Sequence, residues 1–96
     1  MFFTPCDTPI VRIDPLGHST TTIQDAIAHV KSADSVIKAN SNVYLETIVF
    51  SNNMPLTLQG GYDCIIGGIV GYSEVDGQLS LQGTAPVSIG NIVIGP

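Results

Sequence analysis

The sequence has no tryptophan and only three basic residues, Arg12, Lys31 and Lys38, in a chain of 96 residues. Eight acidic residues bring its formal net charge to −5. Nucleic acids and anionic membrane surfaces are bound through clustered Lys and Arg, so this balance argues against both as partners. No apolar run approaches the roughly 18 residues that a membrane-spanning helix needs, so membrane insertion is not predicted.

Signal-peptide features are also lacking, and cysteine is scarce. The start, MFFTPCDTP, has no basic segment followed by a long apolar one, so it does not read as a signal peptide. Cys6 and Cys64 leave two alternatives open. They can form a disulfide in an oxidising compartment. The repeat described below gives Cys64 the parity of the apolar Ile66, which favours a buried free thiol instead.

What the chain does have is apolar content, 44% against 11% charged residues. In so small a protein, either most of these residues fill a core or a partner covers some of them. The length fits a single domain spanning residues 1–96.

The C-terminal half contains a repeat with a period of 23 residues. Residues 56–73 read LTLQGGYDCIIGGIVGYS and residues 79–96 read LSLQGTAPVSIGNIVIGP, with eight identities at 18 aligned positions. A fixed period of this length is typical of stacked copies of one supersecondary unit. Apolar residues alternate in short runs that glycines interrupt, so the predicted unit consists of strands and the predicted fold is an all-β solenoid.

Ahead of the repeat, the pattern predicts an opening strand at 10–14 and a helix at 22–32. Thr21 and Thr22 are the candidate N-caps, and four apolar residues share one helix face: Ile23, Ala26, Ile27 and Val30. We expect this helix to cap the first coil of strands, with stacked coils filling 35–96. The predicted core consists of Ile23, Ile27, Val30, Ile37, Ile48, Phe50, Leu56, Leu58, Cys64, Ile66, Leu79, Leu81, Val87, Ile89, Ile92 and Ile94.

Four segments carry a resemblance to a known family. They are TIQDAI at 22–27, DSVIKA at 34–39, VYLETI at 43–48 and LTLQGGYD at 56–63. In this order they resemble the N-terminal part of right-handed parallel β-helix proteins of the pectin lyase-like superfamily. The chain departs from the family at Asn42-Val43, where Gly-Thr or Gly-Glu usually precedes the tyrosine.

The resemblance implies a short right-handed parallel β-helix of about three coils with an N-terminal capping α-helix. It also implies a polysaccharide-related protein that is secreted or located at the cell surface. Enzymes of this superfamily carry Asp clusters with Arg or Lys on later coils. No basic residue follows Lys38 here, so a lyase-type mechanism is not predicted.

No catalytic, cofactor-binding or metal-binding residue is predicted, and no cofactor. Asp63, Glu74 and Asp76 are interpreted as turn and surface residues rather than as paired acids or calcium ligands. Glu46 is expected to tether a neighbouring turn by hydrogen bonds. His18 and His29 fit no catalytic or metal motif.

The predicted function is that of a non-catalytic module acting by self-association, by surface recognition, or by both. A helix covers one end of the predicted strands, whereas the C-terminal rung has no polar cap. We therefore expect a homo-oligomer formed through that rung. Its candidate contact residues are Val87, Ile89, Ile92, Val93 and Ile94.

Two alternatives stay open. The chain could be a remnant or the N-terminal part of a carbohydrate-active β-helix enzyme of the polysaccharide lyase or hydrolase type. It could also be a small glycan-binding module with a polysaccharide partner, because tyrosine rings stack on sugars. The candidate glycan contacts are Tyr44, Tyr62, Tyr72, Gln59 and Gln82.

Overall fold

The computed structural model describes residues 6, 8–14, 16–30, 35–51 and 54–95. These residues form ten strands and one helix. In chain order the elements are β1 (Val11–Asp14), β2 (His18–Thr20), α1 (Ile23–Ala28), β3 (Val36–Asn40), β4 (Val43–Tyr44), β5 (Ile48–Phe50), β6 (Leu56–Tyr62), β7 (Ser73–Asp76), β8 (Leu79–Leu81), β9 (Val87–Gly90) and β10 (Ile92–Gly95).

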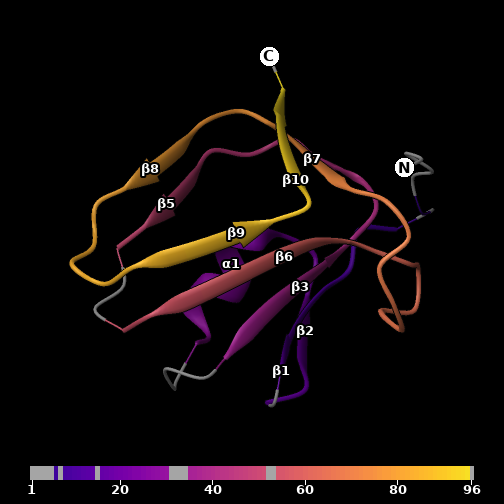
Figure 1. Ribbon diagram of the computed structural model, residues 1–96, viewed down its shortest axis with the longest axis horizontal. Helices are drawn as coiled ribbons and strands as arrows, with labels where there is room; N and C mark the ends of the chain where they lie inside the picture. The colour runs from indigo at the N-terminus through magenta and orange to yellow at the C-terminus, as the bar shows by residue number, and fades with distance from the viewer. Residues whose placement is uncertain (1–5, 7, 15, 31–34, 52–53, 96) are drawn as a thin grey trace.

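The strands form three small sheets. The largest has the order β2-β1-β3-β6-β9, the second β10-β7-β4, and the third pairs β5 with β8. Parallel pairing joins β3 to β6 and β6 to β9 in the first sheet, β4 to β7 and β7 to β10 in the second, and β5 to β8 in the third. In Figure 1, β3, β6 and β9 lie side by side in front of α1, with β5 and β8 to one side.

The predicted fold class, a right-handed parallel β-helical solenoid, is wrong. The largest sheet is mixed, because β1 pairs antiparallel with both β2 and β3. A tight turn makes this possible: Gly17 adopts φ +79° and its N–H donates to the Ile13 carbonyl at 2.6 Å. The described chain forms a compact globule of 34 × 30 × 20 Å with a radius of gyration of 12.1 Å.

The 23-residue repeat does not set the strand register. Leu56 and Leu79 are equivalent in the repeat, yet they lie in different sheets. Leu56 lies opposite Val87 and Leu79 lies opposite Ile48, in both cases 31 residues away in the sequence. The shared LxLQG motif therefore marks two strands of similar local shape, not two strands stacked on each other.

Helix α1 begins where the sequence predicts and covers less of the chain. Thr22 is its N-cap, and its hydroxyl oxygen accepts a hydrogen bond from the Asp25 N–H at 3.2 Å. The helix ends at Ala28, with His29 as C-cap. Residues 31 and 32 of the predicted helix lie outside the described residues.

The core lies between the sheets and the helix, and the predicted list is correct for its central part. Ile23, Ile37, Ile48, Phe50, Leu56, Leu58 and Ile66 are buried, and Ile27, Val30, Leu79, Val87 and Ile92 are partly buried against them. Four predicted core residues are exposed instead: Cys64, Leu81, Ile89 and Ile94. Strands β1, β4 and β7 add core residues that the list omits: Val11, Ile13, Tyr44 and Val75.

Candidate functional site

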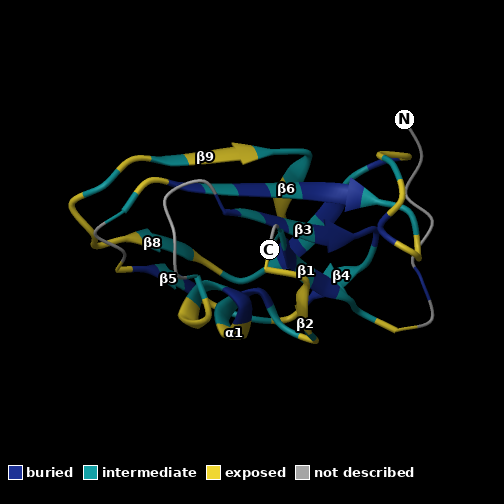
Figure 2. Cartoon of the chain, turned by 90° about the horizontal axis from the view of Figure 1, so that it is seen from below, coloured by how far each residue is buried: buried dark blue, intermediate teal, exposed yellow. Residues whose placement is uncertain are grey.

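Rows of inward-facing side chains cross each sheet and end on β8, β9 and β10, which we call the open end. The inner members of three such rows are fully buried: Phe50, Leu58 and Val75. Their neighbours on the last strands are 67%, 40% and 46% exposed, respectively: Leu81, Ile89 and Ile94. Figure 2 shows the same change from buried β6 to partly exposed β9. Core-type side chains at the open end therefore face solvent.

The open end is also an edge in all three sheets. Strands β9 and β10 are outermost in their sheets, and β8 has a single partner, β5. Edge strands leave backbone N–H and C=O groups ready to pair with another chain, and soluble proteins often protect them with charged side chains. From residue 77 to 95 the sequence contains no charged residue. The open end lacks this protection.

The opposite end of the molecule is closed by α1, which contacts β1, β2, β3 and β5. Figure 2 places α1 and β9 on opposite sides of β3 and β6. Glu46 fixes the helix: its two carboxylate oxygens accept hydrogen bonds from the N–H groups of Ile23 and Gln24, both at 3.0 Å. A carboxylate at this position also favours the positive end of the helix dipole.

Gln24 closes the free edge of β5. Its side-chain nitrogen donates to the Val49 carbonyl at 3.1 Å, and its side-chain oxygen accepts from the Val49 N–H at 2.7 Å. One side-chain amide thus takes the place of a neighbouring strand. The two ends of the molecule differ in kind, since only the closed end has its edge groups satisfied in this way by described residues.

The five residues predicted for self-association all lie on β9 and β10. Ile89, Val93 and Ile94 are exposed, whereas Val87 and Ile92 are partly buried against the core. Leu81, the most exposed of the inward-facing residues at this end, was missed. Its alternation with Leu79 correctly predicts an inward direction. The sequence, however, gives no signal that Leu81 stays uncovered by the described residues.

The five candidate glycan contacts do not gather on one surface. Tyr44 is 3% exposed and its hydroxyl donates to the Asn40 side-chain oxygen at 2.7 Å, so its ring has no open face for stacking. Burial raises the pKa of Tyr44 well above its usual range. Gln59 lies on β6, and its amide nitrogen donates to the Asn91 side-chain oxygen at 2.8 Å.

Of the other three candidates, Tyr62 and Tyr72 lie near each other, since Ser41 donates hydrogen bonds to the backbone carbonyls of both, whereas Gln82 lies apart from them. Tyr62 ends β6, with the Lys38 ammonium 5.6 Å from its ring centroid. Tyr72 immediately precedes β7, and the exposed Gln82 follows β8, which belongs to another sheet. Gln59 and Gln82 are therefore not neighbours: Gln59 lies opposite Lys38 and Gly90 within the five-stranded sheet.

A pair of carboxyl groups lies on β7 beside the open end. Glu74 and Asp76 share one face of the strand, and a hydrogen bond with Asp76, burial and the Asp76 charge together raise the pKa of Glu74. Gly95 of β10 lies so close to Asp76 that a Cβ atom there would collide with its Oδ1. Asp63 is elsewhere: it accepts backbone hydrogen bonds from Ile65 and Gly67 within its own loop.

A second charged group lies on the outer face of the five-stranded sheet. Asp14 forms ion pairs with Arg12 at 3.0 Å and with Lys38 at 2.8 Å. Hydrogen bonds from Lys38 and Arg12 lower the pKa of Asp14. The third basic residue of the chain, Lys31, lies outside the described residues.

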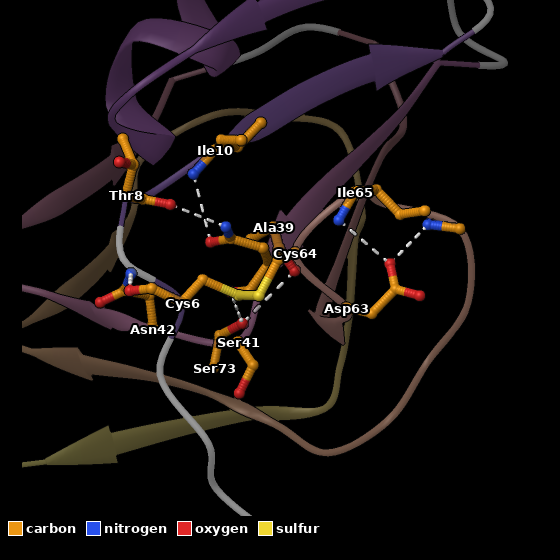
Figure 3. The surroundings of a disulfide bond; sticks show 12 residues. Cys6, Thr8, Ile10, Ala39, Ser41, Asn42, Asp63, Cys64, Ile65 and Ser73 are labelled. Carbon is orange, nitrogen blue, oxygen red and sulfur yellow. Dashed lines mark hydrogen bonds between the residues drawn. A yellow bond between two sulfur atoms is a disulfide. The ribbon is translucent and has the colours of Figure 1, made fainter.

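The two cysteines form a disulfide, so the expectation of a buried free thiol at Cys64 is wrong (Figure 3). Parity fails as a guide at Cys64 because residues 63–72 form a loop rather than a strand. Backbone and side-chain bonds hold the Cys6 segment in place: its N–H donates to the Ser41 carbonyl at 2.8 Å, and its carbonyl accepts from the Asn42 amide at 2.8 Å.

Other kinds of site find little support among the described residues. They contain no cluster of three or more His, Cys, Asp or Glu residues able to hold a metal ion. None of their helices is long and apolar enough to cross a membrane. Comparison of the chain with protein-family models, curated proteins and solved structures finds no match.

Proposed function

We propose that the protein is a non-catalytic module that self-associates by joining the open ends of two copies. The observation that carries this proposal is the exposure of core-type side chains on the last strand of every sheet: Leu81, Ile89 and Ile94. Exposed apolar residues that continue a core are typical of a surface that another polypeptide covers.

A second copy of the chain suits this surface. The protein carries a net charge of −5, so most pairings between two copies would bring like charges together. Residues 77–95 include no charged side chain, so two copies that meet through this segment repel each other least. Backbone groups along the outer edges of β8, β9 and β10, which pair with no strand of the described residues, can then bond across the interface.

The closed end limits the size of the assembly. At that end the Gln24 amide occupies the position where a further strand would pair with β5, and α1 packs against β1, β2, β3 and β5. A head-to-tail chain of copies needs two different surfaces that are complementary to each other. A two-fold dimer needs only one self-complementary surface. The proposed assembly is therefore a closed dimer.

The test is the solution molar mass, measured by light scattering during gel filtration over a wide range of protein concentrations. We expect a dimer that dissociates on dilution. Leu81→Glu should raise the dissociation constant of the dimer by about tenfold or more, because two carboxylates would be buried in an apolar interface. Leu16→Glu is the matched control, since Leu16 is 55% exposed in the β1–β2 turn, at the opposite edge of the five-stranded sheet, and the charge change is identical.

A monomer at every concentration would overturn the proposal, and so would equal weakening by both variants. Membership in the pectin lyase-like superfamily stays a prediction. Secretion or a cell-surface location also stays a prediction, supported by the Cys6–Cys64 disulfide because such bonds persist in oxidising compartments.

A further inference from the structure

We infer that His18 and His29 together form a binding site for a late first-row transition-metal ion such as Zn²⁺. His18 begins β2 and His29 is the C-cap of α1, and both side chains are exposed. Their rings are stacked, with centroids 4.4 Å apart and planes inclined by 30°. The fold thus joins two imidazoles that no sequence motif connects.

The hydrogen bond of His29 leaves the correct nitrogen free to bind a metal. Its Nδ1 lies 2.7 Å from the backbone carbonyl oxygen of Asp25. A carbonyl oxygen can only accept, so Nδ1 carries the proton and the Nε2 of the neutral ring keeps its lone pair. Histidines that bind metals usually donate the other ring N–H to a carbonyl or carboxylate in this way, which fixes tautomer and orientation.

Rotation of the His18 ring can bring both imidazoles to one ion while the Asp25 carbonyl holds the His29 ring. Zinc binds imidazole nitrogen at about 2.0–2.1 Å, which needs the ring planes to converge more steeply than in the stacked pair. The torsion that rotates a histidine ring has a broad energy minimum, and both rings are exposed. Two protein ligands leave the remaining positions to water.

The ligand type selects the class of metal. Imidazole suits Zn²⁺, Cu²⁺ and Ni²⁺, whereas Ca²⁺ and Mg²⁺ require oxygen ligands. The chain has no other histidine, and both cysteines are in the disulfide. Imidazole-dependent binding of these metals therefore reports on this pair alone.

A bound ion would link β2 to the C-terminal end of α1. This joins two elements of the closed end, on the side of the molecule away from β9 (Figure 2). The inference does not depend on the proposed dimer.

The first test is a calorimetric titration with Zn²⁺ of the natural protein and of His18→Gln, His29→Gln and the double variant. Because chelation needs both rings, each single variant should bind roughly tenfold more weakly or worse. The double variant should be only slightly weaker than either single one, since removing one ring already abolishes chelation. Wild-type affinity in either single variant would overturn the inference.

The second test uses Ni²⁺, whose paramagnetism broadens NMR signals of nearby nuclei. Substoichiometric Ni²⁺ should broaden the imidazole signals of His18 and His29 together, with no change in molar mass. Broadening of one ring without the other, or an increase in mass on adding metal, would show binding by single histidines or between copies and would contradict the site.

Discussion

Glu46 connects the β4–β5 turn to the first turn of α1. A helix of six residues is too short to be stable by itself, so its contacts with the rest of the chain decide whether it forms. Both Glu46 oxygens accept backbone N–H groups that an isolated helix would leave unpaired. The tethering role predicted for Glu46 is thus confirmed, with a partner that the sequence did not indicate.

We expect Glu46→Gln to lower the free energy of unfolding by about 1–2 kcal/mol, because it removes the charge and one of the two acceptors. Urea unfolding monitored by circular dichroism measures the change. Glu74→Gln is the control, since it makes the same chemical change away from any helix end. Equal losses in both variants would contradict the role assigned to Glu46.

Glu74 gives the protein a pH dependence of a definite sign. Its pKa in the folded protein is raised above the ordinary value of 4.5, so the fold favours the protonated form. The contribution of Glu74 to stability is then greatest at low pH and is lost as pH rises from the unfolded pKa through the folded one. Urea unfolding across this pH range should show a decline that is smaller in Glu74→Gln. An unchanged profile in this variant would argue against the pairing with Asp76.

Residue-level predictions were most reliable where the interaction is local. The N-cap depends only on neighbouring residues, so it could be narrowed to Thr21 or Thr22, and Thr22 takes the role. Pairings across long separations, such as Gln24 with Val49 or Cys6 with Cys64, depend on the register of the whole fold. The histidine pair belongs to the same class, since His18 and His29 are 11 positions apart in the sequence and lie on different elements, β2 and the end of α1.

At the level of elements, two glycines with the same backbone geometry should differ in cost when replaced. Gly17 and Gly61 have φ of +79° and +78°. A Cβ on Gly17 would meet nothing within 4 Å, whereas one on Gly61 would collide with the Gly71 carbonyl, where the β6–β7 loop returns to β6. Gly17→Ala should cost about 1–2 kcal/mol from backbone strain alone.

Gly61→Ala should cost about 1–3 kcal/mol more, because the strand must also move away from the loop. Thermal unfolding of the two variants under identical conditions measures the difference. Equal losses would show that the contact between Gly61 and Gly71 does not constrain the loop.

Alternation of apolar residues correctly predicted that residues 35–96 are rich in strands, but it could not predict which strands pair. LTLQG on β6 and LSLQG near β8 have the same local preference for a strand followed by a turn. Which strand becomes the parallel partner depends on the lengths of the intervening loops. It also depends on which row of inward-facing side chains each strand extends. Leu58 therefore lies between Ile37 and Ile89, not beside Leu81.

At the scale of the whole molecule, the disulfide joins residues 58 positions apart in the sequence. Closing a loop of this length removes conformational freedom from the unfolded chain, so replacing both cysteines by serine should cost about 4 kcal/mol. Urea unfolding of this variant, beside the natural protein with and without reductant, measures the cost. A stability equal to that of the oxidised protein would contradict a structural role for the bond.

The same bond divides the chain into a covalent ring and a tail. Residues 6–64 form the ring, which contains α1 and β1 to β6, and the tail carries β7 to β10. When the protein opens locally, a ring keeps its parts close together, while a tail can leave as a unit and return. The strands of the open end all belong to the tail. The part of the molecule proposed to meet a second copy thus lies wholly in the tail, outside the covalent ring.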